Sequence, residues 1–413
     1  MHFRSSWRED TRAPRTDTTA VIPLELAPLS EEERAHEARL RARIGSEIEA
    51  AGGAIPFARY MELALYAPGL GYYAAGAHKL GAGGDFVTAP ELTPVFGRCL
   101  ATQCAEILAG LGGGTILELG AGSGALAVEI LGELARRDAL PDAYRILEPS
   151  PDLRERQESL ASALPGALRE RLEWLERMPD VPFAGVLLAN EVLDALPVER
   201  FRVGTGGIES LCVVRKAEGF GWSAVPADAG LLGAVRELEA ARGAPFEACY
   251  TSEVCLRLAP WVATVCAPLS AGVALFIDYG TARRSYYSPE RSAGTFSCYH
   301  RQRRHEDPFV NVGLQDLTAW VDFTAVAEAG LAAGLEVAGY TSQANLLLAL
   351  GFERHLAALR DSLPSSAALL AARTAARLVL PSEMGESFKC IALARRYESP
   401  LAGFSLRDYT NSL

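Results

Sequence analysis

Glycines at every second position form the part of this chain with the clearest chemical meaning. Gly120, Gly122 and Gly124 follow the short apolar stretch Thr115 to Leu119. Glycine allows a backbone to turn sharply and to approach a ligand closely. The amphipathic pattern from Ala125 to Leu131 predicts a helix whose first N–H groups point at the same ligand. A strand, a glycine-rich turn and a helix in this order predict the first unit of a nucleotide-binding α/β domain.

The spacing and the charge of this turn distinguish between cofactors. Proteins that bind a pyrophosphate use the spacing G-x-G-x-x-G, whereas this turn has the spacing G-x-G-x-G. Glu118 lies two residues before the first glycine. A carboxylate there would repel a pyrophosphate, but it could pair with the cationic amino-acid end of S-adenosylmethionine. The turn therefore favours a class I methyltransferase with S-adenosylmethionine as its cofactor. A nicotinamide-dependent enzyme and an α/β loop without a ligand are the alternatives.

Polar residues at the carboxyl ends of further predicted strands are the next candidates, because ligands of open α/β sheets bind at these ends. Glu148 ends the second strand, about 20 residues past the glycine turn, where such folds hold ribose hydroxyls. Asn190 ends the fourth strand, and its amide is expected to contact the cofactor. Glu191 and Asp194 follow it directly, and Asp278 lies at the exit of the next strand.

Methyl transfer chiefly requires that the nucleophile be held against the methyl group in a dry pocket. A guanidinium is a planar cation with forked donors, and carboxylates are its natural bidentate partners. We therefore predict that Glu191 and Asp194 are the catalytic pair, which orients a cationic acceptor and stabilises its charge. Asp278 and Asp85 are the reserves. The alternative for each acid is a helix cap or a strand end without a chemical role.

Two irregular segments of the chain are further candidates. The segment 67–90 contains too many glycines for a regular element, yet it carries aromatic residues, and we predict an ordered lid over the ligand. Asp85, Phe86 and Thr88 lie in this lid and are expected to contact the cofactor. Residues 281–313 are basic and aromatic within an acidic chain. They are interpreted either as a solvated loop or as an ordered, functional excursion.

The elements that must position these residues predict an α/β fold: a Rossmann-like class I methyltransferase sheet with a helical N-terminal segment and inserted β-ribbon and helical segments. The predicted boundaries are a flexible tail (1–30), N-terminal helices with the glycine-rich lid (31–112), the methyltransferase core (113–397) with insertions at 198–270, 281–313 and 343–380, and a C-terminal tail (398–413). Apolar periodicity predicts helices over 31–51, 57–66, 94–111, 231–242, 253–265, 316–329 and 343–378, and strands over 172–175, 183–189, 272–280, 335–341 and 388–394.

Composition argues against several classes of protein. The 413 residues are 49% hydrophobic, which is enough for one large core and a smaller one. The formal net charge of −11 predicts no nucleic-acid partner. No apolar run approaches the length of about 18 residues that a membrane span needs. The eight cysteines form no C-x-x-C pair, which predicts no metal site and suits the cytoplasm.

Several motifs together resemble the MidA family of class I methyltransferases, which includes the mitochondrial arginine methyltransferase that assists respiratory complex I assembly. The resemblance runs from about residue 40 to 397, nearly the whole chain except both tails. The motifs, in family order, are ALYAPGLGYY, GDFVTAPELTPVFG, ILELGAGSGALA, ILEPSPDLRERQ, NEVLDALPVERF, FIDYG, GLQDLTAWVDF, TSQANLLL and PSEMGESFK.

This resemblance implies S-adenosylmethionine as the cofactor, a Rossmann-like core with extra segments, and methyl transfer to protein arginine. A protein or peptide that carries arginine is thus the expected partner. The alternative functions are a small-molecule or peptide O- or N-methyltransferase and a cofactor-binding assembly factor with little turnover, because similarity in the cofactor site does not name the methyl acceptor. The family pattern usually has His at the position of Trp320 in this chain.

Overall fold

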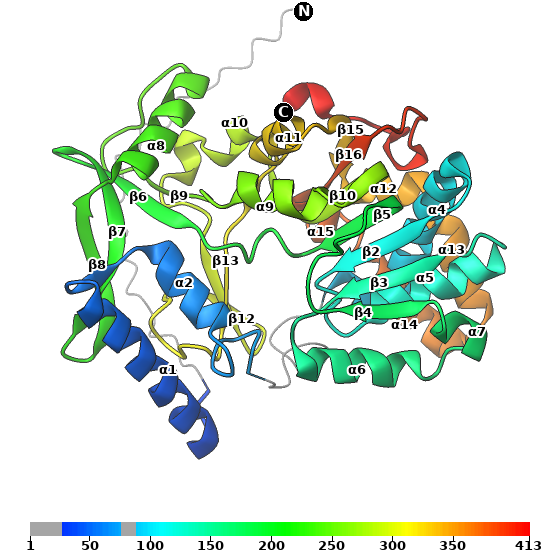
Figure 1. The fold of residues 1–413 in the computed structure, drawn as a ribbon, viewed down its shortest axis with the longest axis horizontal. Coiled ribbons are helices and arrows are strands. Elements are labelled where there is room, and N and C mark those ends of the chain that lie inside the picture. The colour runs from blue at the N-terminus through cyan, green and yellow to red at the C-terminus, as the bar shows by residue number, and fades with distance from the viewer. Residues whose placement is uncertain (1–26, 76–87) are drawn as a thin grey trace, which may run out of the picture.

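An eight-stranded sheet forms the centre of the structure, a computed structural model in which residues 27–75 and 88–413 are described (Figure 1). Its strand order is β15-β16-β10-β5-β2-β3-β4, and the short β14 pairs with β10. The strands from β10 to β4 in this order are parallel, whereas β16 is antiparallel to both β10 and β15. The strands are β2 (Thr115–Leu119), β3 (Ala143–Leu147), β4 (Leu172–Leu175), β5 (Phe183–Asn190), β10 (Leu269–Thr281), β14 (Val321–Asp322), β15 (Glu336–Ser342) and β16 (Phe388–Arg395).

Each central strand divides its residues between two apolar cores, as the two-residue period of a strand requires. In β2, Ile116 packs on one face of the sheet and Leu117 on the other. The first face is covered by α4 (Pro94–Leu111), α5 (Ala125–Arg136), α12 (Gln343–Ala349), α13 (Phe352–Asp361) and α14 (Ser365–Ala376), and the second by α9 (Leu258–Cys266) and α11 (Phe323–Ala332). Because both faces are covered, polar side chains of these strands are concentrated at the strand ends.

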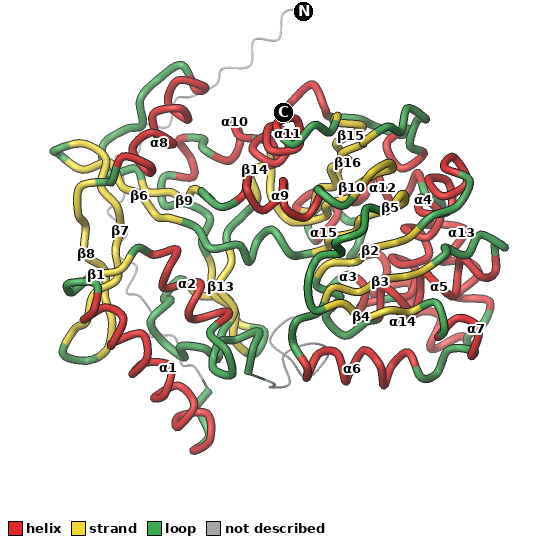
Figure 2. The backbone as a smooth tube through the Cα atoms, in the orientation of Figure 1, coloured by secondary structure: helices red, strands yellow, loops and turns green. Residues whose placement is uncertain are grey.

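A second sheet joins the N-terminal segment to the insertion that follows β5 (Figure 2). Its order is β1-β7-β6-β9, and β8 pairs with β7. The strands are β1 (Ala54–Ile55), β6 (Glu199–Gly204), β7 (Gly207–Lys216), β8 (Gly219–Pro226) and β9 (Thr251–Val254), and the helices of this part are α1 (Glu31–Ala50), α2 (Phe57–Tyr66) and α8 (Ala229–Arg242). The pairing of β1 with β7 shows that two segments predicted as separate build one unit.

The excursion 281–313 contributes to a third, three-stranded sheet of order β12-β11-β13. These strands are β11 (Ser297–His300), β12 (Arg303–His305) and β13 (Asp316–Thr318), preceded by α10 (Arg283–Tyr286) and the 3-10 turn η1 (Pro289–Arg291). The excursion is therefore ordered, as the second of its two interpretations expected. The remaining short elements are α3 (Ala89–Leu92), α6 (Pro151–Ala161), α7 (Gly166–Arg169), α15 (Met384–Ser387), η2 (Ala402–Phe404) and η3 (Thr410–Ser412).

Two predicted helices begin too early. The prediction of a helix over 316–329 is wrong for its first residues, which form β13 and β14, and α11 begins at Phe323. Asp322 fixes this start, since its carboxylate accepts hydrogen bonds from Thr324 N (3.0 Å) and Ala325 N (3.3 Å). The prediction over 253–265 is wrong in the same way, because Glu253 belongs to β9 and is fully buried. Tertiary pairing overrode local helix propensity at both places.

The last residues of the chain, which the sequence predicted as a C-terminal tail, pack on β15. Tyr409 N donates a hydrogen bond to Tyr340 O (2.6 Å), and the Thr341 hydroxyl donates one to Arg407 O (2.6 Å). Strand β15 lies at the edge of the sheet, and the bond from Tyr409 N satisfies a backbone carbonyl that an open edge would leave free. Every helix within the described residues is too short or too polar to span a membrane.

Candidate active site

A cavity of about 1060 Å³ lies at the carboxyl ends of β2, β3, β5 and β10, the edge where open α/β sheets bind their ligands. The sequence candidates that line it are Thr88, Glu118, Gly120, Gly122, Glu148, Asn190, Glu191 and Asp194. Gly124 and Asp278 support its wall without lining it. Asp85 and Phe86 lie outside the described residues. The cavity has two ends of different character.

The first end, which we call the cofactor end, is formed by the glycine turn and residues 147–153. All three glycines of the turn have positive φ angles, +64° at Gly120, +54° at Gly122 and +84° at Gly124. Side chains other than that of glycine are strained in this region. A Cβ on Gly124 would also lie 3.1 Å from Cγ of Gln157. The backbone of the turn, and not its side chains, therefore forms the wall of the cavity.

Glu118 stands beneath this turn and is almost fully buried. Its Oε2 accepts a hydrogen bond from the Tyr144 hydroxyl (2.7 Å). Burial raises the pKa of Glu118 to about 7, although the bond from Tyr144 opposes this shift. A cation at the cofactor end would favour the ionised form of the carboxylate. A carboxylate here could pair with the ammonium group of an amino acid, and this role of Glu118 stays a prediction.

Glu148 lies across the cofactor end from the turn, where its carboxylate is held from two sides. Oε1 accepts a hydrogen bond from Ser150 N (3.0 Å), and Oε2 accepts one from Gln157 Nε2 (3.0 Å). The same Gln157 amide donates to Gly122 O (3.0 Å) and accepts from Trp174 Nε1 (3.0 Å). Gln157 thus ties the acid to the glycine turn. Burial raises the pKa of Glu148, and each of its oxygens retains a lone pair for a ligand hydroxyl.

Thr88 lines the cavity at the point where the predicted lid segment ends. It is the N-cap residue of the short helix α3. Ala89 N, the first N–H of that helix, donates a hydrogen bond to Glu191 Oε1 (3.3 Å). The described parts of the segment 67–90 therefore contact both the cavity and one predicted catalytic acid. The central part of this segment, with Asp85 and Phe86, is outside the described residues.

The second end of the cavity, the acceptor end, carries acids, hydroxyls and aromatic rings. The residues that line it are Tyr66, Tyr73, Glu191, Asp194, Tyr279, Tyr299, Arg304, Asp316, Thr318 and Trp320. Glu191 has a φ of +55°, an unusual angle for a residue with a side chain. Its backbone N–H donates to Ile277 O (2.8 Å), and its Oε1 accepts from Asn190 Nδ2 (3.1 Å). The surrounding bonds hold this strained residue, and such strain is often found at functional sites.

Asp278 supports the loop that carries the acids. It is fully buried, and its Oδ2 accepts hydrogen bonds from Leu193 N (2.9 Å) and Asp194 N (3.2 Å). Its Oδ1 accepts from Tyr279 N (2.9 Å). Burial, followed by the charges of Asp194 and Glu191, raises the pKa of Asp278 well above its ordinary value. The geometry of this reserve candidate is that of a positioning residue.

Four buried oxygen atoms of the cavity lining make no hydrogen bond of normal geometry within the described part of the chain. They are Asn190 Oδ1, Asp194 Oδ1, the Tyr279 hydroxyl and the Thr318 hydroxyl. The Tyr279 hydroxyl nevertheless lies near enough to Asp194 to lower the pKa of that acid against the larger effect of burial, which raises it to about 6. The Tyr279 hydroxyl also lies near the Thr318 hydroxyl, which opposes the rise that burial causes in the pKa of Tyr279. Buried polar atoms normally have partners, so the two pure acceptor atoms, Asn190 Oδ1 and Asp194 Oδ1, favour a ligand that brings donors.

Burial also determines the direction of the pKa shift of Glu191, which is half-buried at the surface of the cavity. It raises the pKa of Glu191 to about 8, and the charge of Asp194 adds to this rise. Two acids with raised pKa values in one cavity are a mark of functional sites. A bound cation would remove the repulsion between them, so the acceptor end favours cations over anions.

The three-stranded sheet supplies a row of side chains to the acceptor end. Tyr299 of β11 lies directly between Arg304 of β12 and Asp316 of β13, and all three line the cavity. The Tyr73 hydroxyl donates a hydrogen bond to Asp316 Oδ1 (2.9 Å). Tyr73 in turn stacks on Tyr66, with 5.6 Å between the ring centroids. Aromatic faces and a carboxylate are suited to holding a flat cation.

The family follows from a match over most of the chain. A family model described as "Putative S-adenosyl-L-methionine-dependent methyltransferase" matches residues 99–341, which include the glycine turn, both strand-end acids and the row of the three-stranded sheet. The chain belongs to this family. As a methyltransferase that depends on S-adenosylmethionine, it has the α/β Rossmann-like fold and the cofactor that the sequence predicted.

Individual relatives cover nearly the whole methyltransferase. It is similar to a protein from Burkholderia thailandensis whose crystal structure contains S-adenosyl-homocysteine, with 40% identity, a TM-score of 0.88, and coverage of 94% of this chain and 100% of the other. It is 29% identical to the protein arginine methyltransferase NDUFAF7, mitochondrial, of Danio rerio, over 86% of this chain and 90% of that protein. The human protein of the same name is 26% identical, over 83% of this chain and 80% of the relative.

Tyr73 was among the aromatic residues of the predicted lid, but the sequence did not single out the other residues of the acceptor end, namely Tyr66, Tyr279, Tyr299, Arg304, Asp316 and Thr318. One signal for them was present. The stretch DLTAWVD alternates polar and apolar residues with the period of a strand, and its extended form places Asp316, Thr318 and Trp320 in the cavity. No comparable pattern marks Gln157, which acts through the tertiary contact of helix α6 with the glycine turn.

Proposed function

We propose that this methyltransferase transfers the methyl group of S-adenosylmethionine to an arginine guanidinium of a protein or peptide. The observation that carries the acceptor class is a pair of buried oxygens that make no hydrogen bond of normal geometry with the described residues: Asp194 Oδ1 at the acceptor end and Asn190 Oδ1 where the two ends meet. A guanidinium has five N–H donors and no acceptor, so it complements such a set. A methyl-accepting group that can only accept hydrogen bonds would be a poor partner for these oxygens.

The proposed cofactor contacts follow from the cofactor end. The glycine turn and Glu118 would hold the amino-acid part, and Glu148 would accept hydrogen bonds from the ribose hydroxyls. Asn190 and Thr88 line the cavity between the two ends, and they would border the reacting group. Bound there, the cofactor supplies an electrophilic methyl group on a sulfonium. The role of Asp85 and Phe86 in covering it stays a prediction.

Glu191 and Asp194 are proposed to hold the guanidinium and to orient one nitrogen for attack. Charge-assisted bonds from a guanidinium to carboxylates are directional and strong in a buried site. The nitrogen that gains the methyl group loses one N–H proton, so the guanidinium keeps its single positive charge. An ionised carboxylate of Glu191 or Asp194 can accept that proton, and the raised pKa values of both acids suit this task.

The names of the relatives support the same acceptor class. Several curated relatives, at 26–29% identity, are called protein arginine methyltransferases. They are also called mitochondrial, so a cytoplasmic location of this chain stays a prediction of its sequence. The absence of a nucleic-acid partner likewise stays a prediction, supported by the net charge of −11.

Transfer of a labelled methyl group into a protein extract tests the proposal. The purified chain is incubated with methyl-labelled S-adenosylmethionine, and protein and small-molecule fractions are counted separately. We expect label in protein, recovered as methylarginine after acid hydrolysis. Label confined to small molecules would favour the small-molecule enzyme, and cofactor binding without any transfer would favour an assembly factor. A Gly122→Val variant, which should not bind the cofactor, is the matched control.

A further inference from the structure

A second cavity of about 480 Å³ lies behind the acceptor end. It is lined by both apolar and charged side chains, which come mainly from α8, α10 and α11 and from parts of β9 and β14. Of the described residues, Trp320 alone lines both cavities. Trp320 is therefore part of the wall between them.

The rest of this wall consists of two backbone segments whose side chains point alternately to either side. In the first segment Leu193 lines the second cavity and Asp194 the first. In the second segment Thr318 lines the first cavity and Ala319 the second. Ala319 N donates a hydrogen bond to Asp194 O (3.1 Å), which joins the two segments. The wall is thus one backbone layer thick, and the indole closes it next to the proposed catalytic acid.

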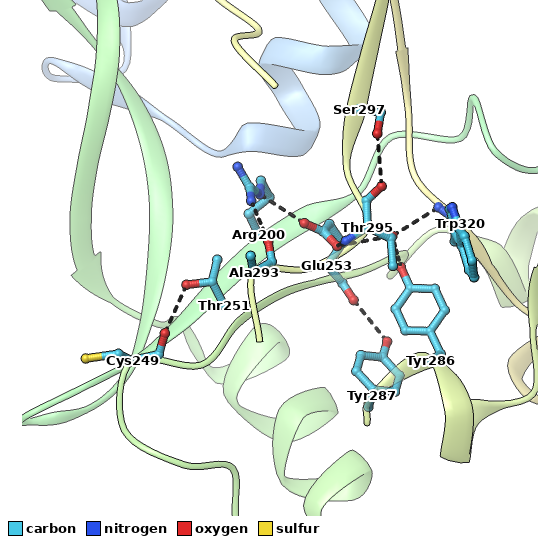
Figure 3. Close-up of polar contacts among 10 residues, drawn as sticks. All are labelled: Arg200, Cys249, Thr251, Glu253, Tyr286, Tyr287, Ala293, Thr295, Ser297 and Trp320. Carbon is cyan, nitrogen blue, oxygen red and sulfur yellow. Dashed lines mark hydrogen bonds and ion pairs between the residues drawn. The ribbon is translucent and has the colours of Figure 1, made fainter. Parts of the chain in front are cut away.

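Trp320 is held in the wall by a network of buried polar groups (Figure 3). Trp320 N donates a hydrogen bond to the Thr295 hydroxyl (3.1 Å). Thr295 N donates to Glu253 Oε2 (2.8 Å), and Glu253 Oε1 accepts from Arg200 Nε (3.1 Å). Because Glu253 is fully buried, breaking its ion pair would leave an unpaired charge in the interior and strongly destabilise the fold.

The ring of Trp320 is fixed as well as its backbone. The guanidinium of Arg291 lies over the indole, with 4.9 Å from Cζ to the ring centroid. The ring also packs against the apolar cluster that contains Tyr286 and Tyr287. Tyr286 donates or accepts a hydrogen bond with the same Thr295 hydroxyl (3.1 Å). A side chain held at both its backbone and its ring makes a rigid boundary.

We infer that Trp320 determines which acceptors this methyltransferase takes, by closing the acceptor end against the second cavity and so limiting the size of the group beside Asp194. The inference rests on the proposed arginine acceptor. One nitrogen of a bound guanidinium faces the cofactor, and a substituent on another nitrogen must fit against the wall. Removal of the indole joins the two cavities and gives such a substituent room.

Binding of substituted guanidines to the complex with S-adenosyl-homocysteine tests this inference by calorimetry. The probes are N-butylguanidine, whose chain imitates an arginine side chain, and its N′-methyl, N′-ethyl and N′-benzyl derivatives. With the wild-type protein, affinity should fall at least tenfold from the N′-methyl to the N′-benzyl compound. Trp320→Ala should abolish this fall, because the benzyl group can occupy the volume of the indole. Trp320→Phe should give an intermediate result.

The matched control is Leu238→Ala, which enlarges the second cavity from its far side and leaves the wall intact. It should bind the four probes as the wild type does. An unchanged fall in affinity in both Trp320 variants would overturn the inference about Trp320 alone. If Trp320→Ala does not fold, the Phe variant decides by the same criterion. If no guanidine binds to any variant while S-adenosyl-homocysteine still does, the arginine proposal fails, and this inference fails with it.

Discussion

The two ends of the large cavity are built in different ways. The cofactor end comes from one continuous stretch, in which the glycine turn, Glu148 and Gln157 all lie between residues 118 and 157. The acceptor end brings together side chains from α2, from the loop after β5, from β10 and from the three-stranded sheet. The hydrogen bond from Tyr73 to Asp316 joins residues that are 243 positions apart.

This difference has a physical consequence for substitutions. The wall of the cofactor end is backbone in a left-handed conformation, so a side chain introduced there acts by sterics and strain. The acceptor end consists of charged and hydroxyl groups, so changes there act through charge and hydrogen bonding. Variants of the first end should therefore abolish cofactor binding, whereas variants of the second should spare it and impair transfer.

The largest effect is expected for Gly122→Val. A β-branched residue is strongly disfavoured at a φ of +54°, and its side chain would start on the wall of the cavity. We expect the affinity for S-adenosylmethionine to fall by about 100-fold or more, equivalent to about 2.7 kcal/mol. Calorimetry measures it. The control is Gly132→Ala in helix α5, where an added Cβ would meet Arg136 Nη1 at an ordinary contact distance of 3.8 Å. Equal affinity of both variants would contradict the assignment of the cofactor end.

Removal of charge at the acceptor end is expected to reduce transfer by about 100-fold, from about 2.7 kcal/mol of lost transition-state stabilisation. The variants are Glu191→Gln and Asp194→Asn, which keep shape and hydrogen-bonding capacity. Single-turnover methyl transfer measures the effect, and the affinity for S-adenosylmethionine should change little. Glu239→Gln is the matched control, since Glu239 is as buried as Asp194 but lies outside both cavities. Wild-type transfer in both variants would make these acids structural.

The rate of methyl transfer should depend on pH through the ionisation of Glu191 and Asp194. Glu191 has a pKa of about 8 and Asp194 one of about 6 in the protein without acceptor. Below these values the acids are neutral, so an acceptor cation loses its partners as the pH falls. We expect kcat/KM for the acceptor to rise by about 100-fold from pH 6 to pH 8, because an acid of pKa 8 goes from about 1% to about 50% ionised and one of pKa 6 from about 50% to about 99%.

The Glu191→Gln variant sharpens this test. The pH profile of this variant should lose the rise towards pH 8 and keep only the part that belongs to Asp194, which is complete by about pH 7.

The raised pKa of Glu191 also predicts how the stability of the fold changes with pH. A carboxyl whose pKa is higher in the folded state than its ordinary value makes folding less favourable as the pH rises from 4.5 to 8. Glu191→Gln should therefore unfold at a higher temperature than wild type at pH 8, and similarly to it at pH 5.

At the cofactor end, Glu148→Ala is expected to have a smaller effect than Gly122→Val. It removes an acceptor of ribose hydroxyls but leaves the backbone turn in place. A lost hydrogen bond to a charged group costs about 1.5–3 kcal/mol, so affinity for S-adenosylmethionine should fall by about tenfold or more. Glu173→Ala on the neighbouring strand is the control, because that acid is paired with Arg145 outside the cavity. Unchanged affinity in Glu148→Ala would remove this residue from the site.

The contrast between the ends also explains what the sequence could predict. The glycine turn and the acid of β3 follow from local periodicity and spacing, and the structure places both at the cavity. The acids Glu191 and Asp194 could be predicted as well, because ligands of open α/β sheets bind at the carboxyl ends of the strands. The remaining acceptor residues depend on the pairing of β11 with β12 and β13, and no local pattern specifies which distant strands pair.

The wrong start of the helix predicted over 316–329 is the error that hid the most residues of the site. A helical reading spreads Asp316, Thr318 and Trp320 around a cylinder, whereas the observed extended backbone points all three into one cavity. Apolar content favoured the helix, and the two-residue alternation of the first seven residues favoured the strand. The capping bonds of Asp322, which mark the true start of the helix, are formed only with the extended segment before it.

The smallest effect is expected for Tyr73→Phe, which removes one hydroxyl from the acceptor end and keeps its ring stacked on Tyr66. Asp316 Oδ1 would lose the hydrogen bond from Tyr73 but keep the one from Leu317 N (2.9 Å). A single hydrogen bond to a charged group contributes about 1.5–3 kcal/mol at most, and water or the acceptor can replace part of it. We therefore expect KM for the acceptor to rise about threefold to tenfold, with kcat and the affinity for S-adenosylmethionine nearly unchanged.

The matched control is Tyr250→Phe. It removes a hydroxyl that lies outside the cavity and donates a hydrogen bond to Ser288 O. Steady-state kinetics at several acceptor concentrations separates KM from kcat. A loss of cofactor affinity in Tyr73→Phe would show that the two ends are coupled through this tyrosine, and the division between them would then have to be redrawn.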